Sequence, residues 1–228
     1  MTQLHLANLG RATRTTIHCP TCQMQYNKID PHDQKLHSQH HMSIVNGPLF
    51  WKSPVPTALS YYTMNPGLKG TFLLITRSSG KIHQVNALKL LKTIDIALGA
   101  PRNVNRSQFF PRGGKIFGLV SEEGRIISLV AAERIEYAYR RIASGGDNSG
   151  VETAGEKEKA VMGISRMWTC ISERGKGYCK ALLEESLYGF IWAVKVTKDQ
   201  VAFSTPSESG MEVARRWSGR EDFLVYDD

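Results

Sequence analysis

The chain has 228 residues, of which 41% are hydrophobic, and it carries a formal net charge of +8. This length and apolar content allow one domain of ordinary size with a smaller appendage, and they exclude a disordered or fibrous chain. The basic residues are spread along the chain, so they indicate an acidic partner without identifying it. Residues 1–16 lack the pattern of a signal peptide and no apolar run is long enough to span a membrane. We therefore expect a soluble protein inside the cell, with no membrane partner.

The first predicted element is a metal-binding finger over residues 17–43. Cys19 and Cys22 form a C-x2-C pair, and His37 and His41 follow at the i, i+4 spacing that places both imidazoles on one face of a helix. Two thiolates and two imidazoles complete a tetrahedral Zn2+ site. Because the protein fills all four positions, the zinc is predicted to be structural.

Two alternatives stay open for this segment. His40 could replace His41 as the fourth ligand, and the two cysteines could form a redox C-x-x-C pair with incidental histidines. The segment is too short to fold by burial alone, so a metal contribution on the order of 10 kcal/mol is expected to stabilise it.

An irregular connector and then an α/β pattern follow the finger. Residues 44–70 are rich in proline and glycine with aromatic residues between them, which predicts a connector that packs. From residue 71 to 228 we predict a mixed α/β (α+β) domain with one hairpin turn at Glu123-Gly124. Residues 144–159 are polar and rich in glycine, which predicts a flexible surface loop. The predicted strands cover 71–77, 115–120, 125–132, 160–170, 200–204 and 223–226, and the helices 85–98, 178–192 and 209–217.

The run over residues 167–183 carries the strongest signal of function. A predicted strand ends, a loop with two glycines covers residues 174–177, and a helix begins at once. Such a loop directs backbone N–H groups into one concavity at a helix N-terminus, where the helix dipole favours an anion. It predicts a pyrophosphate cradle, and an ordinary glycine-containing loop is the alternative. The Walker A and dinucleotide patterns are both absent from this run.

The spacing from Arg174 through Gly177 to Cys179 resembles the R/Q-x-x-G-x-G/A pattern of GNAT acetyltransferases, with Cys where Gly or Ala is usual. Together with the finger and the runs GISRMW, LYGF and VAFSTPSESG, it makes the sequence similar to the cohesin acetyltransferases of the ESCO family, over residues 19–41 and 163–226. The resemblance implies a GNAT fold with a mixed central sheet, acetyl-CoA as donor, and lysines of the SMC subunit of cohesin as acceptors. It further implies a nuclear, chromatin-associated lysine N-acetyltransferase that establishes sister-chromatid cohesion.

The resemblance also implies the cofactor contacts. In the family, backbone groups of the strand contact the cofactor, the glycine loop holds its pyrophosphate, and a later segment lies along its far end. The positions that match are Met167, Trp168, Thr169, Arg174, Gly175, Lys176, Gly177, Tyr178, Cys179, Lys180, Ser207, Glu208 and Ser209.

The chemistry requires a neutral lysine amine. Deprotonating a lysine with its reference pKa at pH 7 costs about 4.6 kcal/mol, which a base or desolvation has to offset. The resemblance places Ser165 and Thr205 near the reacting centre, although related sequences often carry Asp where Thr205 stands. Threonine cannot act as a carboxylate base, so we expect both residues to hold a water or orient the lysine, with Glu208 as the alternative base. An ordinary strand serine is the alternative interpretation of Ser165.

Two other functions remain open. The finger could bind DNA, although a single finger contacts only about three base pairs and fingers usually work in arrays. The GNAT domain could also acetylate another protein or a small amine. Near the N-terminus, Gln3 and Leu6 match the start of a peptide that binds the replication sliding clamp, but the paired aromatic residues of that peptide are missing.

Overall fold

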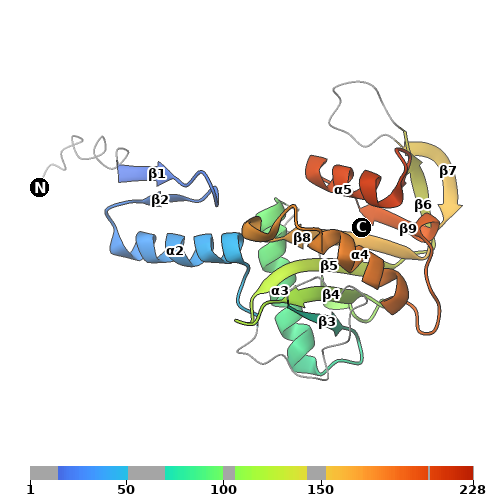
Figure 1. Ribbon diagram of the computed structural model, residues 1–228, viewed down its shortest axis with the longest axis horizontal. Coiled ribbons are helices and arrows are strands. Elements are labelled where there is room, and N and C mark those ends of the chain that lie inside the picture. The colour runs from blue at the N-terminus through green and yellow to red at the C-terminus, as the bar shows by residue number, and fades with distance from the viewer. Residues whose placement is uncertain (1–14, 51–69, 100–105, 143–152, 205, 228) are drawn as a thin grey trace, which may run out of the picture.

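A β-hairpin and one helix make up the N-terminal part of the structure. The computed structural model describes residues 15–50, 70–99, 106–142, 153–204 and 206–227 (Figure 1). Strands β1 (Thr16–His18) and β2 (Gln25–Asn27) pair antiparallel, and helix α2 (Pro31–Asn46) follows. The helix begins here because the Asp30 side chain accepts a hydrogen bond from the backbone N–H of His32, at 2.8 Å. Every residue of α2 is at least partly exposed, so apolar packing contributes little to this part.

An eight-stranded mixed sheet forms the larger part of the structure. Its strand order is β3-β4-β5-β8-β9-β10-β6-β7. Strand β9 pairs parallel with both of its neighbours, and the other pairs among the described strands are antiparallel. The strands are β3 (Thr71–Ile75), β4 (Lys115–Val120), β5 (Ile126–Arg134), β6 (Tyr137–Arg141), β7 (Thr153–Lys159), β8 (Met162–Thr169), β9 (Val201–Ser204) and β10 (Leu224–Tyr226).

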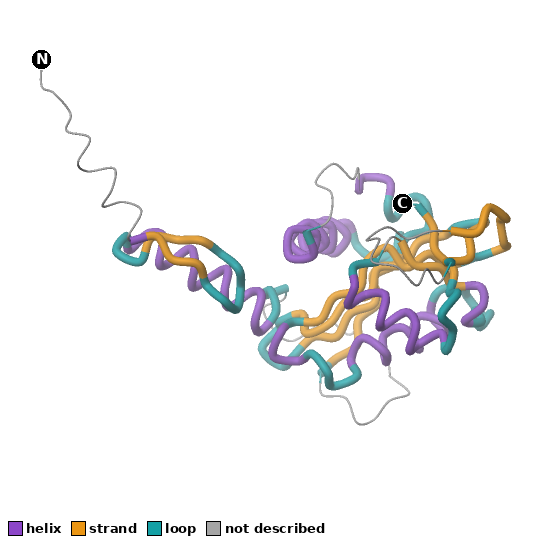
Figure 2. The backbone as a smooth tube through the Cα atoms, turned by 90° about the horizontal axis from the view of Figure 1, so that it is seen from above, coloured by secondary structure: helices purple, strands orange, loops and turns teal. Residues whose placement is uncertain are grey.

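Helices cover both faces of the sheet. Helix α3 (Lys81–Leu98) lies on one face, and α4 (Tyr178–Gly189) and α5 (Glu208–Ser218) lie on the other (Figures 1 and 2). Successive side chains of β8 point to opposite faces, as the pleat requires: Arg166 reaches α3, and Met167 lies beside Gly210 of α5. Of the helices in the described part of the chain, none combines the length and apolar character that a membrane crossing needs.

Strands β8 and β9 pair only at their beginnings. The last pair is Ile164 with Phe203, and beyond it the two strands part. On its other side, β8 has a β-bulge against β5. Arg166 pairs with Ala131 and Ile164 pairs with Ala132, so Ser165 is the extra residue of the bulge. The bulge re-aims the end of β8, so its edge toward β9 is open over the following residues.

A buried ion pair fixes this point of the sheet to α3. Arg166 Nε donates to Asp95 Oδ1 at 2.7 Å, and the two side chains are only 7% and 12% exposed. The same guanidinium donates through Nη1 to the carbonyl of Ser165, which also accepts a hydrogen bond from Ser204 Oγ at 3.0 Å. The Ser165 carbonyl is therefore held by a side chain of β8, which is fixed to α3, and by a side chain of β9.

The segment after α2 joins the turn between β4 and β5. The backbone N–H of Ile126 donates to Pro48 O at 3.0 Å, and that of Phe50 donates to Gly124 O at 2.9 Å. Gly47, with φ +90°, permits this approach, because a Cβ there would lie 2.0 Å from the carbonyl oxygen of Ile126. Helix α2 also contacts the short 3-10 helix η4 (Ile171–Glu173), so the finger is docked on the larger part.

Most predicted elements are confirmed with shifted bounds, and two expectations need correction. The predicted flexible loop at 144–159 is wrong in its second half, since residues 153–159 form β7. The helix predicted over 178–192 ends at Gly189. Strands β1, β2 and β6 were not predicted. Residues 51–69 of the connector, and Gln3 and Leu6, lie outside the described residues, and the division into 17–43, 44–70 and 71–228 stays a prediction.

Removing one partner of the buried ion pair should destabilise the fold. Asp95→Ala leaves the Arg166 guanidinium without the carboxylate to which Nε donates, which we expect to lower the free energy of unfolding by about 3 kcal/mol. Urea denaturation followed by far-UV circular dichroism measures this change. The double variant Asp95→Leu with Arg166→Met is the control, since it removes both charges and should recover most of the loss. If Asp95→Ala unfolds at the wild-type midpoint, the pair does not anchor α3.

Candidate functional site

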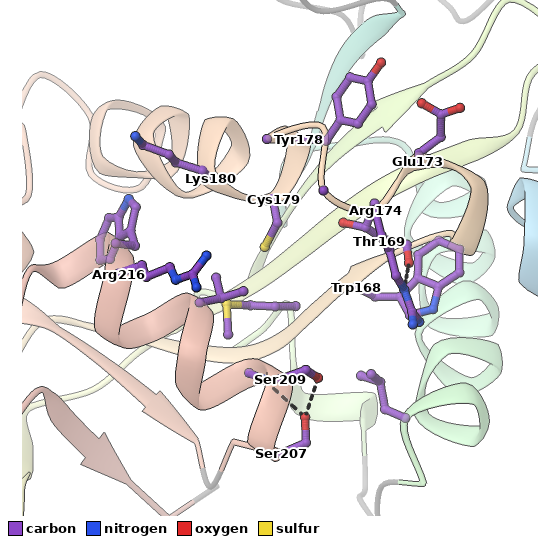
Figure 3. A pocket seen from close by; sticks show the side chains of 17 residues that line it. Trp168, Thr169, Glu173, Arg174, Tyr178, Cys179, Lys180, Ser207, Ser209 and Arg216 are labelled. Carbon is purple, nitrogen blue, oxygen red and sulfur yellow. Dashed lines mark hydrogen bonds between the residues drawn. The ribbon is translucent and has the colours of Figure 1, made fainter. Parts of the chain in front are cut away.

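A cleft of about 500 Å³ opens where β8 ends, between the N-terminus of α4 and helix α5 (Figure 3). It receives residues from both faces of the sheet, because the parting of β8 and β9 leaves a gap between them. The residues that line it are Leu98, Met167, Trp168, Thr169, Glu173, Arg174, Gly175, Gly177, Tyr178, Cys179, Lys180, Ser207, Ser209, Gly210, Val213, Arg216 and Trp217.

The glycine loop leaves open space beside its backbone. Gly175 and Gly177 have φ of +76° and +85°, and a Cβ added at either would meet no atom of the described chain within 4 Å. Gly177 is the N-cap of α4 and has no side chain, so it supplies no capping acceptor for the first N–H groups of the helix. A group with several anionic oxygens fits this arrangement, because it can approach the backbone and accept those hydrogen bonds.

Basic side chains surround the loop. Three basic residues line the cleft: Arg174, Lys180 and Arg216. Glu173 is the one carboxylate among the lining residues, and it forms an ion pair with Lys176 Nζ at 3.0 Å. The Arg174 Nε donates to the carbonyl of Thr169 at 3.2 Å, which holds the arginine stem against the end of β8. The excess of positive charge favours a phosphorylated ligand over a neutral one.

The structure gathers nearly all of the predicted cofactor residues in this cleft. Lys176 and Glu208 are the exceptions: Lys176 turns to Glu173, and Glu208 is exposed at the first position of α5. The sequence prediction missed Leu98, Glu173, Gly210, Val213, Arg216 and Trp217. The spacing of Gly210, Val213 and Trp217 is the i, i+3, i+7 pattern of one helix face and could have indicated that α5 lines a site.

The cysteine in the cleft is not a nucleophile. Burial raises the pKa of the Cys179 thiol to about 12, so the thiol stays protonated at neutral pH. Burial also raises the pKa of Cys170, which stands just before η4. Cys179 therefore packs in the cleft wall, and Cys170 packs in the core of the larger part.

The predicted catalytic residues lie in three different environments. Ser165 is buried at the bulge, where its Oγ donates to the carbonyl of Ala131 at 3.4 Å. Thr205 lies outside the described residues, and Glu208 is exposed at the start of α5. The catalytic roles of these three residues stay predictions.

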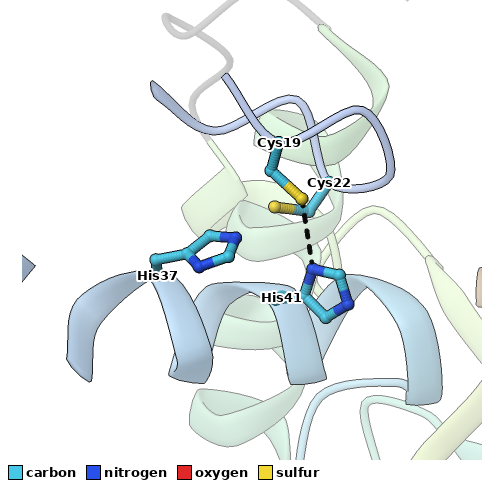
Figure 4. A group of neighbouring side chains, drawn as sticks. All are labelled: Cys19, Cys22, His37 and His41. Atoms are coloured by element: carbon cyan, nitrogen blue, oxygen red, sulfur yellow. Dashed lines mark hydrogen bonds between the residues drawn. The ribbon is translucent and has the colours of Figure 1, made fainter. Parts of the chain in front are cut away.

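The four predicted metal ligands converge at one point between β1, β2 and α2 (Figure 4). The ligand atoms of Cys19, Cys22, His37 and His41 all lie within 4.8 Å of one another, and Cys19 Sγ is 3.4 Å from His41 Nδ1. His37 Nε2 is buried with no hydrogen-bond partner in the described part of the chain. A ligand atom that is buried and unsatisfied fits a metal ion, because such a group is otherwise costly. His40 is not a member of this group, so the alternative with His40 as fourth ligand is wrong.

The surroundings of Cys19 favour a thiolate. The backbone N–H of Cys22 and the side chain of His37 lower the pKa of Cys19 to about 5, whereas burial raises the pKa of Cys22. The His37 ring stacks on Tyr26 with ring centroids 3.8 Å apart, which fixes the orientation of the imidazole. Two sulfurs and two imidazoles within this radius are the donor set of a structural Zn2+ site.

Comparison with known proteins places both parts of the chain. The profile for the ESCO1/2 acetyl-transferase matches residues 158–226, and the profile for the zinc-finger of acetyl-transferase ESCO matches residues 3–43. The N-acetyltransferase ECO1 of Yarrowia lipolytica is 30% identical over 213 residues, covering 93% of this chain and 70% of the relative. The N-acetyltransferase eso1 of Schizosaccharomyces pombe is 30% identical over 229 residues, and human N-acetyltransferase ESCO2 is 26% identical over 219. This chain spans 24% and 35% of the lengths of those two relatives.

Solved structures agree with these relatives. The xEco2 acetyltransferase domain bound to a K105-CoA conjugate superposes with a TM-score of 0.64 at 26% identity, covering 70% of this chain and 94% of that one. The parted parallel strands and the glycine loop at a helix N-terminus define the larger part as a GNAT-type acetyltransferase fold, to which a C2H2-type finger is attached. The chain belongs to the ESCO family of acetyltransferases.

The metal site should hold one zinc ion per chain. We expect Cys19→Ser and His37→Ala each to lose the metal, because three remaining ligands do not complete the tetrahedron. Elemental analysis by mass spectrometry measures the zinc content, and Ser38→Ala on the exposed side of α2 is the control. The larger part has its own core and should keep its thermal transition and its affinity for acetyl-CoA within a few-fold. Simultaneous loss of zinc and of the sheet would show instead that the finger is required for the whole fold.

The glycine loop should discriminate by charge. Gly177→Asp places a carboxylate where we expect a pyrophosphate, and like-charge repulsion should reduce acetyl-CoA affinity about 100-fold or more. Gly177→Asn is the matched control, because asparagine tolerates the left-handed backbone and has almost the same shape without the charge. Isothermal titration calorimetry with acetyl-CoA measures both variants. Equal affinity in the two variants would contradict a pyrophosphate cradle at this loop.

Proposed function

We propose that this chain is an acetyl-CoA-dependent protein lysine N-acetyltransferase that acts on the SMC subunit of cohesin in the nucleus, on chromatin, and thereby establishes sister-chromatid cohesion. The observation that carries the proposal is the glycine loop at the N-terminus of α4, which opens into the gap between β8 and β9. Membership of the ESCO family and the CoA conjugate described for a solved relative support the same donor.

The cleft supplies the two binding functions that acetyl-CoA requires. The N–H groups at the start of α4, with Arg174 and Lys180 beside them, suit the pyrophosphate. Beyond Ser165, whose carbonyl is already bonded, the edge of β8 toward β9 has backbone groups that β9 no longer pairs, and these can bond the amide groups of the pantetheine arm. A backbone N–H at this edge can also donate to the thioester carbonyl, where negative charge develops as the amine attacks.

The choice of acceptor rests on the family. An attacking lysine has to lose a proton at a cost of about 4.6 kcal/mol at pH 7, so a protein acceptor must be held where a base or a dry environment offsets that cost. The basic character of the chain, with its net charge of +8, fits an acidic partner surface. Acetylation of a different protein or of a small amine, and DNA binding by the finger, are the functions that an experiment has to separate from this one.

Labelled acetyl-CoA tests the proposal directly. Incubation with purified cohesin should label the SMC subunit, and mass spectrometry should map the label to lysine side chains. The Gly177→Asp variant is the control for transfer that does not depend on the cleft. Labelling of spermidine but not of cohesin would show a small-amine acetyltransferase, and tight binding to duplex DNA without acetyl transfer would favour the finger as the functional part.

Ser165 and Thr205 should affect the chemical step rather than cofactor binding. If both orient a water or the lysine, Ser165→Ala and Thr205→Ala should each lower the rate of acetyl transfer about 10-fold and leave acetyl-CoA affinity within a few-fold of wild type. The double variant should lose less than the product of the two single losses, since groups that position one water act as a unit. Single-turnover rates give this comparison. Wild-type rates in both single variants would make the two residues structural.

A further inference from the structure

Glu133 and Tyr226 form a hydrogen-bonded pair that connects two distant strands of the sheet. The Tyr226 hydroxyl donates to Glu133 Oε1 at 2.6 Å, although the residues belong to β10 and β5 and two strands lie between them. The tyrosine is buried and the glutamate is half-buried. A pair of this kind places a carboxylate over the middle of the sheet.

The pair lies on the face of the sheet opposite to α5. Phe203 of β9 packs against Trp217 of α5, with ring centroids 5.9 Å apart, so Ala202 and Ser204 on either side of it point to the other face. Tyr226 is the register partner of Ser204, and residues that face each other across paired strands share a face. Helix α3 lies on this side of the sheet, which is the side opposite to the start of α4.

A glycine makes room for this arrangement. Gly163 is the register partner of Glu133 on β8, and a Cβ at Gly163 would lie 2.5 Å from Cζ and 2.9 Å from the hydroxyl of Tyr226. The phenol ring therefore lies directly across β8, and any side chain at Gly163 would displace it. The carboxylate of Glu133 is held where the ring ends, above this strand.

The pair stands beside the point where β8 and β9 part. Gly163 precedes the last pair of these strands by one residue, and Ser204, the partner of Tyr226, donates to the carbonyl of Ser165. The cleft reaches this side of the sheet, because it is lined by Leu98 of α3 as well as by Cys179 and Val213 of α4 and α5. Glu133 is not among the residues that line the cleft, but it lies on the α3 side of the sheet, across β8 from the last residues that β8 pairs with β9, where an amine could approach the gap from that side.

The proposed acetyl transfer needs a group near the gap that accepts a proton from the lysine ammonium. Thr205 cannot accept a proton as a carboxylate does, and Glu208 is exposed at the start of α5. A carboxylate has about four lone-pair sites, so Glu133 retains acceptor capacity while it holds the Tyr226 hydroxyl. It can attract a lysine ammonium and then take its proton.

We propose that Glu133 is the catalytic proton acceptor for the attacking lysine and that Tyr226 is its positioning residue. Gly163 has no side chain and so leaves the space across β8 through which Tyr226 reaches Glu133. This inference rests on the proposed acetyl transfer. The lysine ammonium gives one proton to a Glu133 oxygen, and the freed nitrogen lone pair forms the C–N bond at the thioester carbon. The C–S bond breaks, the sulfur leaves as thiolate and takes the second proton lost by the nitrogen, and Glu133 returns its proton to solvent.

A nucleophile that needs no base separates this role from a structural one. Glu133→Gln keeps the shape and the bond to Tyr226 but cannot accept the proton, so acetyl transfer to cohesin lysines should fall about 100-fold or more. Hydroxylamine is largely uncharged at pH 7, so transfer from acetyl-CoA to hydroxylamine should stay within threefold of wild type. Glu136→Gln, an exposed glutamate in the connection after β5, is the control and should leave both rates unchanged.

The positioning residues are tested in the same assay. Tyr226→Phe and Gly163→Ala should lower kcat for lysine about 10-fold, with the KM for acetyl-CoA unchanged, because neither residue lines the cofactor cleft. A loss of less than threefold in Glu133→Gln, or equal losses with lysine and with hydroxylamine, would overturn the proposal. If the wild-type protein transfers to hydroxylamine but not to cohesin, the acceptor in the proposed function is wrong, and the Glu133 variants are then compared on a lysine peptide.

Discussion

The parting of β8 from β9 is the constraint on which the rest of the structure depends. Two parallel strands inside a sheet normally satisfy each other's backbone groups over their full length, and here they stop at Ile164 and Phe203. The open edge has to be held in place without a partner strand. The bulge carbonyl of Ser165 meets this need, because Ser204 Oγ holds it from β9 and the Arg166 guanidinium, itself fixed by Asp95, holds it from α3.

The two faces of the sheet beside the gap carry side chains of opposite charge. On one side the glycine loop, Arg174 and Lys180 favour an anionic ligand that can approach backbone closely. On the other side Glu133 and Tyr226 present a carboxylate that favours a cationic amine. In the mechanism that we propose, a donor with phosphate groups binds on one face, an acceptor with an ammonium group approaches from the other, and the two meet in the gap.

Local sequence patterns predicted the parts of the site that depend on neighbours in sequence. The finger ligands and the glycine loop were recognisable because their spacing alone fixes their geometry, whether on one helix face or at one helix N-terminus. Long-range pairing was not recognisable: the β6–β7 hairpin pairs with the C-terminal strand β10, and Tyr226 meets Glu133 across strands far apart in the chain. The polar, glycine-rich composition before residue 160 does not indicate a strand. Residues 153–159 form β7 because they pair with β6, and not because of their own strand propensity.

The finger contacts the larger part at two places. Pro48 and Phe50 extend the turn between β4 and β5, and α2 contacts η4, which directly precedes the glycine loop. Since α2 buries little apolar surface, its orientation depends on the cluster that joins His37 to Cys19 and Cys22. A metal ion at that cluster would thus fix the orientation of α2 within the finger. The sheet and the glycine loop are held by a core of their own, so the cleft should keep its form when the metal is lost.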